Sequence, residues 1–473
     1  MRLTQAQIVA FSAATVLVPA ADDQAAVVAF HWDSRNVQPN TAFIALPGER
    51  TDGNDYLQAA LQAGASCLLA SRRPSSDIWK QAQARGAALL LVEDAQQALF
   101  ALAGAARQLL PAKVVAITGS SGKTSTKELA AAVLRAADPQ LTVSGGNHNN
   151  EVGLPATILA ANPDSRLLVL EMGMYGLGEI AQLAAVAKPE VGIITNIGVA
   201  HLELLGSREN IARAKAELIS ALPDRSGVAI LPGDDPYTPF IRATAAADQR
   251  ELRILSYGLG PQNDIRASDI AYDQLGRPSF TLKGLAAAPV GVTLQLQGEH
   301  SVRNALAAAA AGIVCGLNLE QIAAALAAAE PFTMRQVNIT LPNGTLLIDD
   351  TYNANPDSMR AALEVLASIE DDRPHIAVLG DMLELGPDEL QLHADIGQQA
   401  AASGIDLLLA VGERSRAMAA AARRAGMPQR CVICVPDARA AADYLLSKQR
   451  DAAVILVKAS RGLGLEKVVQ ALC

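Results

Sequence analysis

The chain has 473 residues, of which 50% are hydrophobic and 18% charged, and its formal net charge is −9. At roughly 150 residues per domain, this length predicts about three domains with sizeable cores. The acidic balance argues against a general nucleic-acid-binding protein, which would carry a basic face. No apolar run reaches the ~18 residues of a membrane-spanning helix, so no membrane insertion is expected. The odd number of cysteines does not describe a disulfide framework, and we expect a reduced, cytoplasmic protein.

Two local patterns imitate other classes of protein. The apolar stretch at residues 8–18 loosely resembles a signal peptide, but polar residues interrupt it, and a short buried helix followed by a strand is expected. Cys431 and Cys434 have the spacing of a zinc or redox pair. Their segment is typical of a buried strand, in which residues three apart point to opposite faces. We therefore expect both cysteines to be structural.

The pattern of apolar runs divides the chain into three α/β segments, 1–84, 85–331 and 332–473. Strands that alternate with helices favour a mostly parallel sheet covered on both faces. Strands are expected at 41–46, 66–70, 113–118, 167–170, 191–194, 345–348, 375–379, 406–411 and 453–457, helices at 56–63 and 123–137, β-rich structure at 252–296, and an alanine-rich helical stretch at 302–329.

The strongest local signal is the run Thr118–Ser125, with the sequence TGSSGKTS. It lies between a predicted strand and a predicted helix, which is the context of a phosphate-binding loop. Glycines permit the tight turn, and the helix N-terminus adds a positive partial charge. Lys123 would then reach the β- and γ-phosphates of a nucleotide, and Thr124 would bind Mg²⁺. Ile117 replaces the first glycine of the longer form of this motif.

Two further polar residues follow predicted strands on the same edge of the sheet. Glu171 and His201 could share one divalent metal there, since ligands bind outside the carboxyl ends of the strands. The alternative is a solvated glutamate and a structural histidine. For Lys215, within a helical run, the residues alone favour a solvent-facing side chain.

These residues resemble the ATPase domain of the Mur ligase family. The resemblance covers 113–128, 146–155, 171–173, 195–203 and 214–217. Residues 33–35, 43–46 and 52–53 resemble the family's UDP-sugar domain. The run 349–356, DDTYNANP, resembles the signature of the member that adds D-alanyl-D-alanine, and 380–386 with His393 supports that member. The chain departs from the family pattern at Asn54, 231–233, Met334 and Ala459.

The resemblance implies a small α/β UDP-sugar-binding domain, a central P-loop ATPase domain with a mostly parallel sheet, and a C-terminal Rossmann-like α/β domain. ATP would be held by Gly119, Ser120, Ser121, Gly122, Lys123, Thr124 and Ser125, its adenine by Asn304, its ribose by Asp350 and a phosphate by Arg335. Mg²⁺ would be held by Thr124, Glu171, His201 and Lys215, the last being carbamylated in several relatives. UDP would contact Ser34 and Arg35, the muramoyl-peptide the loop with Asn147, Asn149 and Asn150, and the dipeptide Asn353 and Asn355.

The implied activity is formation of an amide bond at the cost of ATP, with Lys123, His201 and Lys215 as catalytic residues. The terminal carboxylate of UDP-N-acetylmuramoyl-tripeptide would be phosphorylated, and the amine of D-alanyl-D-alanine would attack the acyl phosphate. The expected protein is a monomer with small-molecule substrates and no nucleic-acid partner. The alternatives are a Mur ligase that adds the third amino acid, a folylpolyglutamate synthase, and a nucleotide-controlled regulatory module. The run 352–356 argues against the first two.

Overall fold

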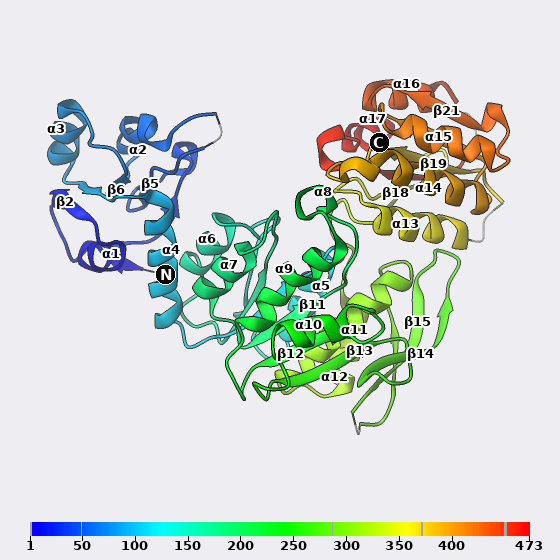
Figure 1. The fold of residues 1–473 in the computed structure, drawn as a ribbon. Coiled ribbons are helices and arrows are strands. Elements are labelled where there is room, and N and C mark those ends of the chain that lie inside the picture. The colour runs from blue at the N-terminus through cyan, green and yellow to red at the C-terminus, as the bar shows by residue number, and fades with distance from the viewer. Residues whose placement is uncertain (1, 49, 286, 370–371, 449–451) are drawn as a thin grey trace.

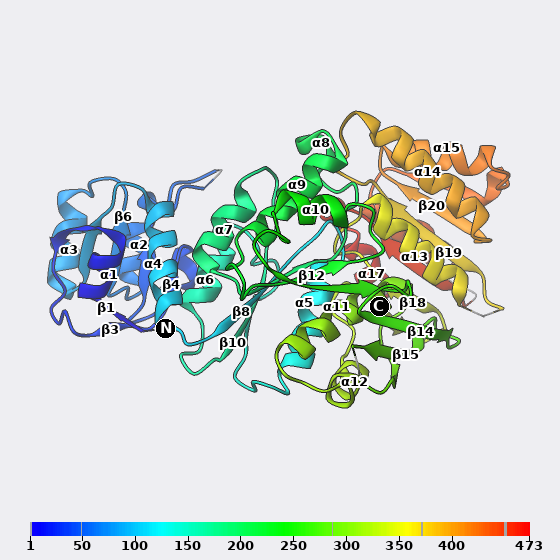
Figure 2. The same cartoon turned by 60° about the horizontal axis from the view of Figure 1, so that its bottom comes forward.

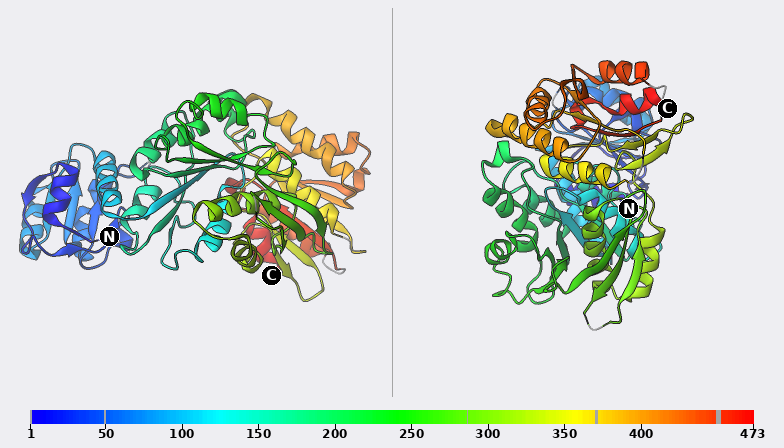
Figure 3. Two further views of the ribbon diagram at one scale, coloured as in Figure 1. Left: turned by 90° about the horizontal axis from the view of Figure 1, so that it is seen from below. Right: turned by 90° about the vertical axis from the view of Figure 1, so that its right-hand side faces the viewer.

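A computed structural model describes residues 2–48, 50–285, 287–369, 372–448 and 452–473. Three main sheets follow one another along the chain, and the central sheet lies between the N-terminal and C-terminal ones (Figure 1, Figure 3). The predicted α/β fold is therefore confirmed. No helix within the described ranges has both the length and the apolar composition needed to cross a bilayer.

The N-terminal sheet has five strands in the order β2-β7-β6-β5-β4, and only the β2–β7 pair is antiparallel. It includes β7, which lies beyond residue 84. The predicted helix and strand near the N-terminus are present as α1 and β2, although β2 is a partly exposed edge strand. The elements are β1 (Leu3–Thr4), α1 (Gln5–Ser12), β2 (Thr15–Val18), β3 (Ala26–Val27), β4 (Phe30–His31), β5 (Ala42–Ile44), α2 (Leu57–Gln62), β6 (Cys67–Ala70), α3 (Ser76–Arg85) and β7 (Ala88–Leu91).

One long helix, α4 (Ala95–Leu109), joins this domain to the central one. It packs on α1 on one side and on α6 (Gly153–Leu159) and α7 (Glu179–Ala187) on the other. One apolar core therefore continues across α4. The buried guanidinium of Arg107 adds a hydrogen bond of 2.8 Å to the carbonyl of Ala187.

The central sheet has nine strands in the order β16-β15-β14-β13-β12-β11-β8-β10-β9. Pairs from β9 to β14 are parallel, and β14, β15 and β16 pair antiparallel. The strands are β8 (Lys113–Thr118), β9 (Thr142–Val143), β10 (Leu167–Glu171), β11 (Val191–Ile194), β12 (Val228–Pro232), β13 (Arg253–Gly258), β14 (Ile265–Tyr272), β15 (Pro278–Gly284) and β16 (Val290–Thr293).

Helices cover both faces of this sheet because successive strand residues point to opposite sides. On β8, Val114 and Ala116 belong to one core, and Val115 and Ile117 to the other. The first face carries α6, α7, α9 (Arg208–Ser220) and α10 (Thr238–Thr244), and the second carries α5 (Lys123–Leu134), α11 (Glu299–Val314) and α12 (Leu319–Ala328) (Figure 2).

The alanine-rich stretch is helical, as predicted, and it forms two packed helices with a break between them. Gly316 has a φ of 88° between α11 and α12, a conformation that interrupts a right-handed helix. Asn318 then begins α12 with a capping box, in which its side chain accepts from the backbone N–H of Gln321.

The C-terminal sheet has six strands in the order β17-β18-β22-β19-β20-β21, and only β17 is antiparallel to its neighbour. Its two faces are covered by α13, α14 and α15 and by α16 and α17. The elements are β17 (Val337–Thr340), β18 (Leu346–Asp349), α13 (Pro356–Ser368), β19 (His375–Gly380), α14 (Glu389–Ala402), β20 (Leu407–Val411), α15 (Ser415–Arg424), β21 (Val432–Val435), α16 (Ala438–Lys448), β22 (Val454–Lys458) and α17 (Glu466–Leu472).

The sequence predicted a buried strand for Cys431 and Cys434. The strand found there is only partly buried, so this prediction is wrong. β21 is the edge strand, and its outward-pointing Cys434 is exposed. Cys431 precedes the strand and is half-buried.

Candidate functional site

The predicted phosphate-binding loop lies between β8 and α5, at the carboxyl edge of the central sheet. Gly122 has a φ of 76° and begins α5. A Cβ at Gly122 would lie 2.6 Å from Oδ1 of Asn304, and one at Gly119 would lie 1.7 Å from Oγ1 of Thr195. Both positions therefore require glycine. The first N–H groups of α5 have no partner within the helix and can bind an anion.

A second loop, at the end of β11, supports the phosphate-binding loop. Asn196 accepts from the N–H of Ser120 through its carbonyl (3.1 Å) and from the N–H of Ser121 through Oδ1 (2.8 Å). Thr195 donates through Oγ1 to the carbonyl of Ser121 at 2.5 Å. Thr195 and Asn196 were not predicted to have a function, although they follow a buried strand and open the run 195–203 that resembles the family.

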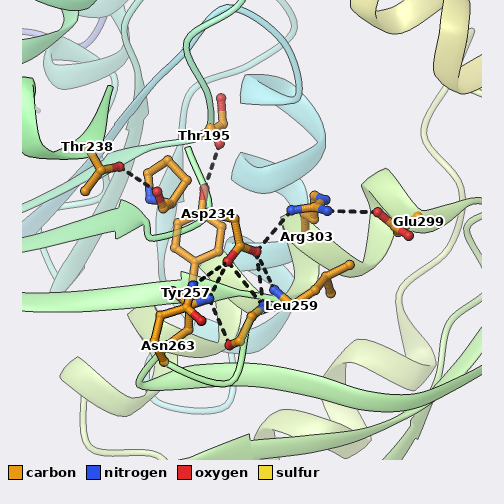
Figure 4. A network of polar contacts seen from close by, with 11 residues as sticks. Thr195, Asp234, Thr238, Tyr257, Leu259, Asn263, Glu299 and Arg303 are labelled. Carbon is orange, nitrogen blue, oxygen red and sulfur yellow. Dashed lines mark hydrogen bonds and ion pairs between the residues drawn. The ribbon is translucent and has the colours of Figure 1, made fainter. Parts of the chain in front are cut away.

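Figure 4 shows the contacts that hold this second loop and the start of α11. The hydroxyl of Tyr257 lies 2.9 Å from the carbonyl oxygens of both Ile194 and Thr195. Burial raises the pKa of Tyr257, so its phenol stays protonated and can donate. Asp234 accepts from the N–H of Leu259 and pairs with Arg303, the residue before Asn304.

Two lysines, Lys123 and Lys215, lie near the loop. Nζ of Lys123 donates to the carbonyl of Gly119 at 2.8 Å. Burial lowers the pKa of Lys123, Arg335 lowers it further, and Glu171 opposes both. Burial and the charge of Lys123 hold the pKa of Lys215 well below its usual range, which favours the neutral amine.

The solvent-facing reading of Lys215 is wrong, because its side chain is 1% exposed. The helical period of α9 places it on one face with the buried residues Ile211 and Leu218. That face packs against the sheet.

A further cation comes from the segment between α12 and β17. Nη2 of Arg335 donates to Oγ1 of Thr124 at 2.9 Å. Its guanidinium stacks 4.1 Å from the ring centroid of Tyr352, in the C-terminal domain. A cavity of about 670 Å³ runs beside these residues, along α5 and the segment 328–335.

The predicted metal ligand Glu171 is buried at the end of β10. Nδ2 of Asn149 donates to its Oε1 at 2.8 Å, whereas its Oε2 has no hydrogen-bond partner among the described residues. Asn149 belongs to the loop 145–150, and its carbonyl accepts from the N–H of Gly173. The loop expected to contact the peptide substrate therefore meets the expected metal site.

His201 lies between the central and C-terminal domains. Its backbone has a φ of 63°, and its ring contacts Tyr175 edge-on at 5.4 Å. Nδ1 lies 2.9 Å from Oε2 of Glu384, and this contact lowers the pKa of Glu384. Glu384 was missed as a contact of His201, and only its place in the run 380–386 gave a signal.

The described residues fit a hard divalent cation such as Mg²⁺. Oε2 of Glu171 is a buried oxygen with no hydrogen-bond partner in the described part of the chain, and the hydroxyl oxygen of Thr124 accepts from Arg335. No group of three His, Cys, Asp or Glu side chains is suited to hold a metal within the described ranges. That is compatible with Mg²⁺, which usually takes one or two carboxylates and completes its shell with water and phosphate.

The predicted nucleoside contacts also meet at a domain boundary. Asn304 lies beside Gly122, and Oδ2 of Asp350 pairs with Nζ of Lys458 at 2.7 Å. His300 is close enough to Asp350 and Lys458 for their charges to act on its pKa, which partial burial of the ring lowers most. His300 and Lys458 were missed, although His300 lies one helical turn before Asn304 and Lys458 directly precedes Ala459.

Other predicted site residues have local partners. Arg35 lies in the N-terminal domain beside Ser34, and its guanidinium pairs with Asp33 at 2.6 Å. Asn147 is exposed in its loop. The side-chain oxygens of the remaining asparagines accept hydrogen bonds from nearby backbone N–H groups. Asn150 accepts from Gly153, Asn353 from Ala354 and Asn355 from Ser358. Asn355 thereby caps the N-terminus of α13.

Three family models match the chain. They are the Mur ligase middle domain over residues 117–312, the Mur ligase, glutamate ligase domain over 334–461, and the Mur ligase family, catalytic domain over 29–76. Each match overlaps a different one of the three sheets.

Relatives match over nearly the whole chain. A UDP-N-acetylmuramoyl-tripeptide–D-alanyl-D-alanine ligase of Mycobacterium bovis is 39% identical, over 93% of this chain and 91% of its own length. The crystal structure of MurF from Acinetobacter baumannii has a TM-score of 0.88 at 31% identity and covers 100% of this chain and 99% of its own. MurF ligase from Thermotoga maritima in complex with ADP has a TM-score of 0.80 at 27% identity, with coverage of 94% and 97%.

Substitution of Gly119 tests the geometry of the phosphate-binding loop. Gly119→Ala should weaken ADP binding by about tenfold or more, because a displaced loop loses at least one hydrogen bond to a charged group. Isothermal titration calorimetry measures this. Gly104→Ala is the control, since a Cβ there has no neighbour within 4 Å. Equal ADP affinity in both variants would contradict the requirement for glycine.

Proposed function

This chain belongs to the Mur ligase family, and on that premise we propose that it joins D-alanyl-D-alanine to UDP-N-acetylmuramoyl-tripeptide, with ATP as the energy source. The products are UDP-N-acetylmuramoyl-pentapeptide, ADP and phosphate. The reaction belongs to peptidoglycan precursor synthesis, and we propose the cytoplasm as its place.

One observation carries this proposal: groups from three parts of the chain meet at the phosphate-binding loop. Arg335 donates to Thr124 of the loop, and Asn149 donates to Glu171 at the end of the neighbouring strand. Nucleotide and acceptor carboxylate would therefore meet at the carboxyl edge of the central sheet, where open α/β sheets bind ligands.

The chemistry follows from the weakness of a carboxylate as an acylating group. The carboxylate oxygen of the tripeptide attacks the γ-phosphorus of ATP, and ADP leaves. The backbone N–H groups of the loop, Lys123 and Arg335 would offset the negative charge that spreads over the moving phosphoryl group. The amine of D-alanyl-D-alanine then attacks the acyl phosphate, loses a proton and expels phosphate.

Mg²⁺, when bound, would neutralise phosphate charge. We propose Thr124, Glu171 and His201 as residues that hold it, together with Lys215 as a carbamate, as the resemblance implies. Only a neutral amine adds to CO₂, and the lowered pKa of Lys215 favours that form. Carbamylation would convert a buried amine beside Lys123 into an anionic oxygen ligand, which suits a divalent metal.

The remaining predicted residues lie in different domains, and each set would bind a different part of the substrates. We propose that Ser34 and Arg35 bind UDP, that Asn147, Asn149 and Asn150 bind the muramoyl-peptide, and that Asn353 and Asn355 shape the dipeptide site. Asn304 would contact adenine and Asp350 the ribose. Holding three reactants in register is expected to supply much of the rate.

Phosphate release tests the proposed reaction directly. With ATP and Mg²⁺ present, we expect release only when UDP-muramoyl-tripeptide and D-alanyl-D-alanine are added together, accompanied by the mass of the pentapeptide product. Release with another amino acid would retain a ligase and change its substrate. Slow release that ignores both substrates would instead support a regulatory nucleotide-binding module.

The role of Lys215 is tested by removing its side chain. Lys215→Ala should lower kcat by about a hundredfold or more, the scale of losing one electrostatic contact to the transition state. Acetate or formate should restore part of the activity, because a free carboxylate can replace the carbamate. Lys80→Ala, at an exposed lysine of α3, is the control. Near-normal activity of Lys215→Ala without added acid would remove Lys215 from the site.

We also expect the C-terminal domain to close on the central domain when both ligands bind. Arg335 and Asp350 approach the nucleotide from outside the central sheet, so binding of an ATP analogue and UDP-muramoyl-tripeptide should draw the C-terminal domain inward and exclude water from the acyl phosphate. Small-angle X-ray scattering should show a smaller radius of gyration with both ligands than without them. Identical scattering profiles would contradict closure.

A further inference from the structure

Lys127 is a buried cation to which the proposed reaction gives no role. It lies one turn after Lys123 on α5, and its side chain is 0% exposed. Nζ donates to the carbonyl of Ser144 at 2.7 Å and lies 2.8 Å from Oε1 of Glu128. The helix that begins at the phosphate-binding loop is thereby connected to the end of β9.

Ser144 connects Lys127 to the expected metal ligand. Its N–H donates to the carbonyl of Val169, which continues the pairing of β9 with β10. Its hydroxyl accepts from the N–H of Glu171 at 3.2 Å. One residue therefore receives Lys127 at its carbonyl and Glu171 at its hydroxyl.

The loop 145–150 begins directly after Ser144 and returns to the same glutamate. Nδ2 of Asn149 donates to Oε1 of Glu171, and the carbonyl of Asn149 accepts from the N–H of Gly173. Hydrogen bonds thus connect both ends of the loop to β10 and to the segment after it. Lys127 binds Ser144, the residue at the first of these ends. Figure 2 shows α5 and β10 as neighbouring elements of the central domain.

Stability alone does not explain a charged side chain at this position. Burying an ammonium group is costly, and an apolar side chain of similar size often stabilises a protein as well or better. A lysine gains a directed hydrogen bond that methionine cannot make. Its effect is therefore on geometry, since it sets where the carbonyl of Ser144 lies relative to α5.

We propose that Lys127 is a positioning residue that sets the loop 145–150 against the phosphate-binding helix, so that Asn149 and Glu171 face the acceptor carboxylate and the γ-phosphate together. This inference rests on the proposed function, which assigns the peptide substrate to that loop. Lys127 touches neither substrate. It acts through Ser144.

The test separates binding of the two ligands. Lys127→Met should weaken binding of UDP-muramoyl-tripeptide by about tenfold, the effect of one lost hydrogen bond to a charged group, and leave ADP affinity within about twofold. Calorimetry with each ligand alone measures both. Lys127→Arg should recover most of the tripeptide affinity, because a guanidinium can also donate to the carbonyl of Ser144.

The control is Leu129→Ala, on the same helix and equally buried. It should lower the melting temperature without a selective loss of tripeptide affinity, which distinguishes positioning from general weakening of α5. Equal loss of ADP and tripeptide affinity in Lys127→Met, or no loss of either, would overturn the inference.

A double variant adds a test of the route. If Lys127 acts through the loop, Lys127→Met combined with Asn149→Ala should bind tripeptide no more weakly than Asn149→Ala alone. Additive losses would overturn that route. Failure of the wild-type chain to bind UDP-muramoyl-tripeptide would overturn the proposed function and this inference with it, whereas binding followed by ligation of another amine would overturn only the dipeptide specificity.

Discussion

The close crossing of two loops at the carboxyl edge of the central sheet is the constraint on which the site depends. Gly119 passes so near Thr195 that no side chain fits between them. The backbone N–H groups of Ser120 and Ser121 are then held by Asn196. Because these two N–H groups are satisfied by the protein, the turn keeps its shape without a ligand, and the start of α5 remains directed toward an anion.

The second loop needs its own support, because it provides the hydrogen bonds that shape the first. Tyr257 contacts its backbone at Ile194 and Thr195, and Asp235 accepts from the N–H of Ile197. Tyr257 lies in β13, and Asp235 lies in the turn after β12, so both belong to the neighbouring part of the same sheet. The order of strands therefore determines the phosphate-binding loop as much as its own glycines do.

The three lysines of the site, Lys123, Lys215 and Lys458, differ in their surroundings. Lys123 donates to a backbone carbonyl, and Lys458 pairs with the carboxylate of Asp350. Lys215 takes another course, because burial and the neighbouring charge of Lys123 lower its pKa. An isolated buried charge is costly, so each lysine must find a counter-group or give up its proton. Burial lowers the pKa of Lys123 as well, where Glu171 opposes the shift, whereas the charge of Lys123 adds to the shift of Lys215.

The sequence by itself determined the α/β fold, the strand–loop–helix unit around Gly119, Gly122 and Lys123, and the family. These depend on short-range patterns, namely apolar strands, the spacing of glycines and runs that resemble relatives. It also placed Glu171 at a strand end. It did not predict the break at Gly316, since alanine favours helix on both sides and only the left-handed backbone interrupts it.

Only the tertiary structure decided which distant residues meet. A helical pattern cannot tell which face of α9 is covered, so Lys215 looked solvent-facing until its helix was packed on the sheet. The partners of Asn196, Lys127 and Glu384 lie in other segments of the chain. Their contacts arise from the order of the strands and the placement of whole domains, which long-range packing sets and local sequence spacing does not record.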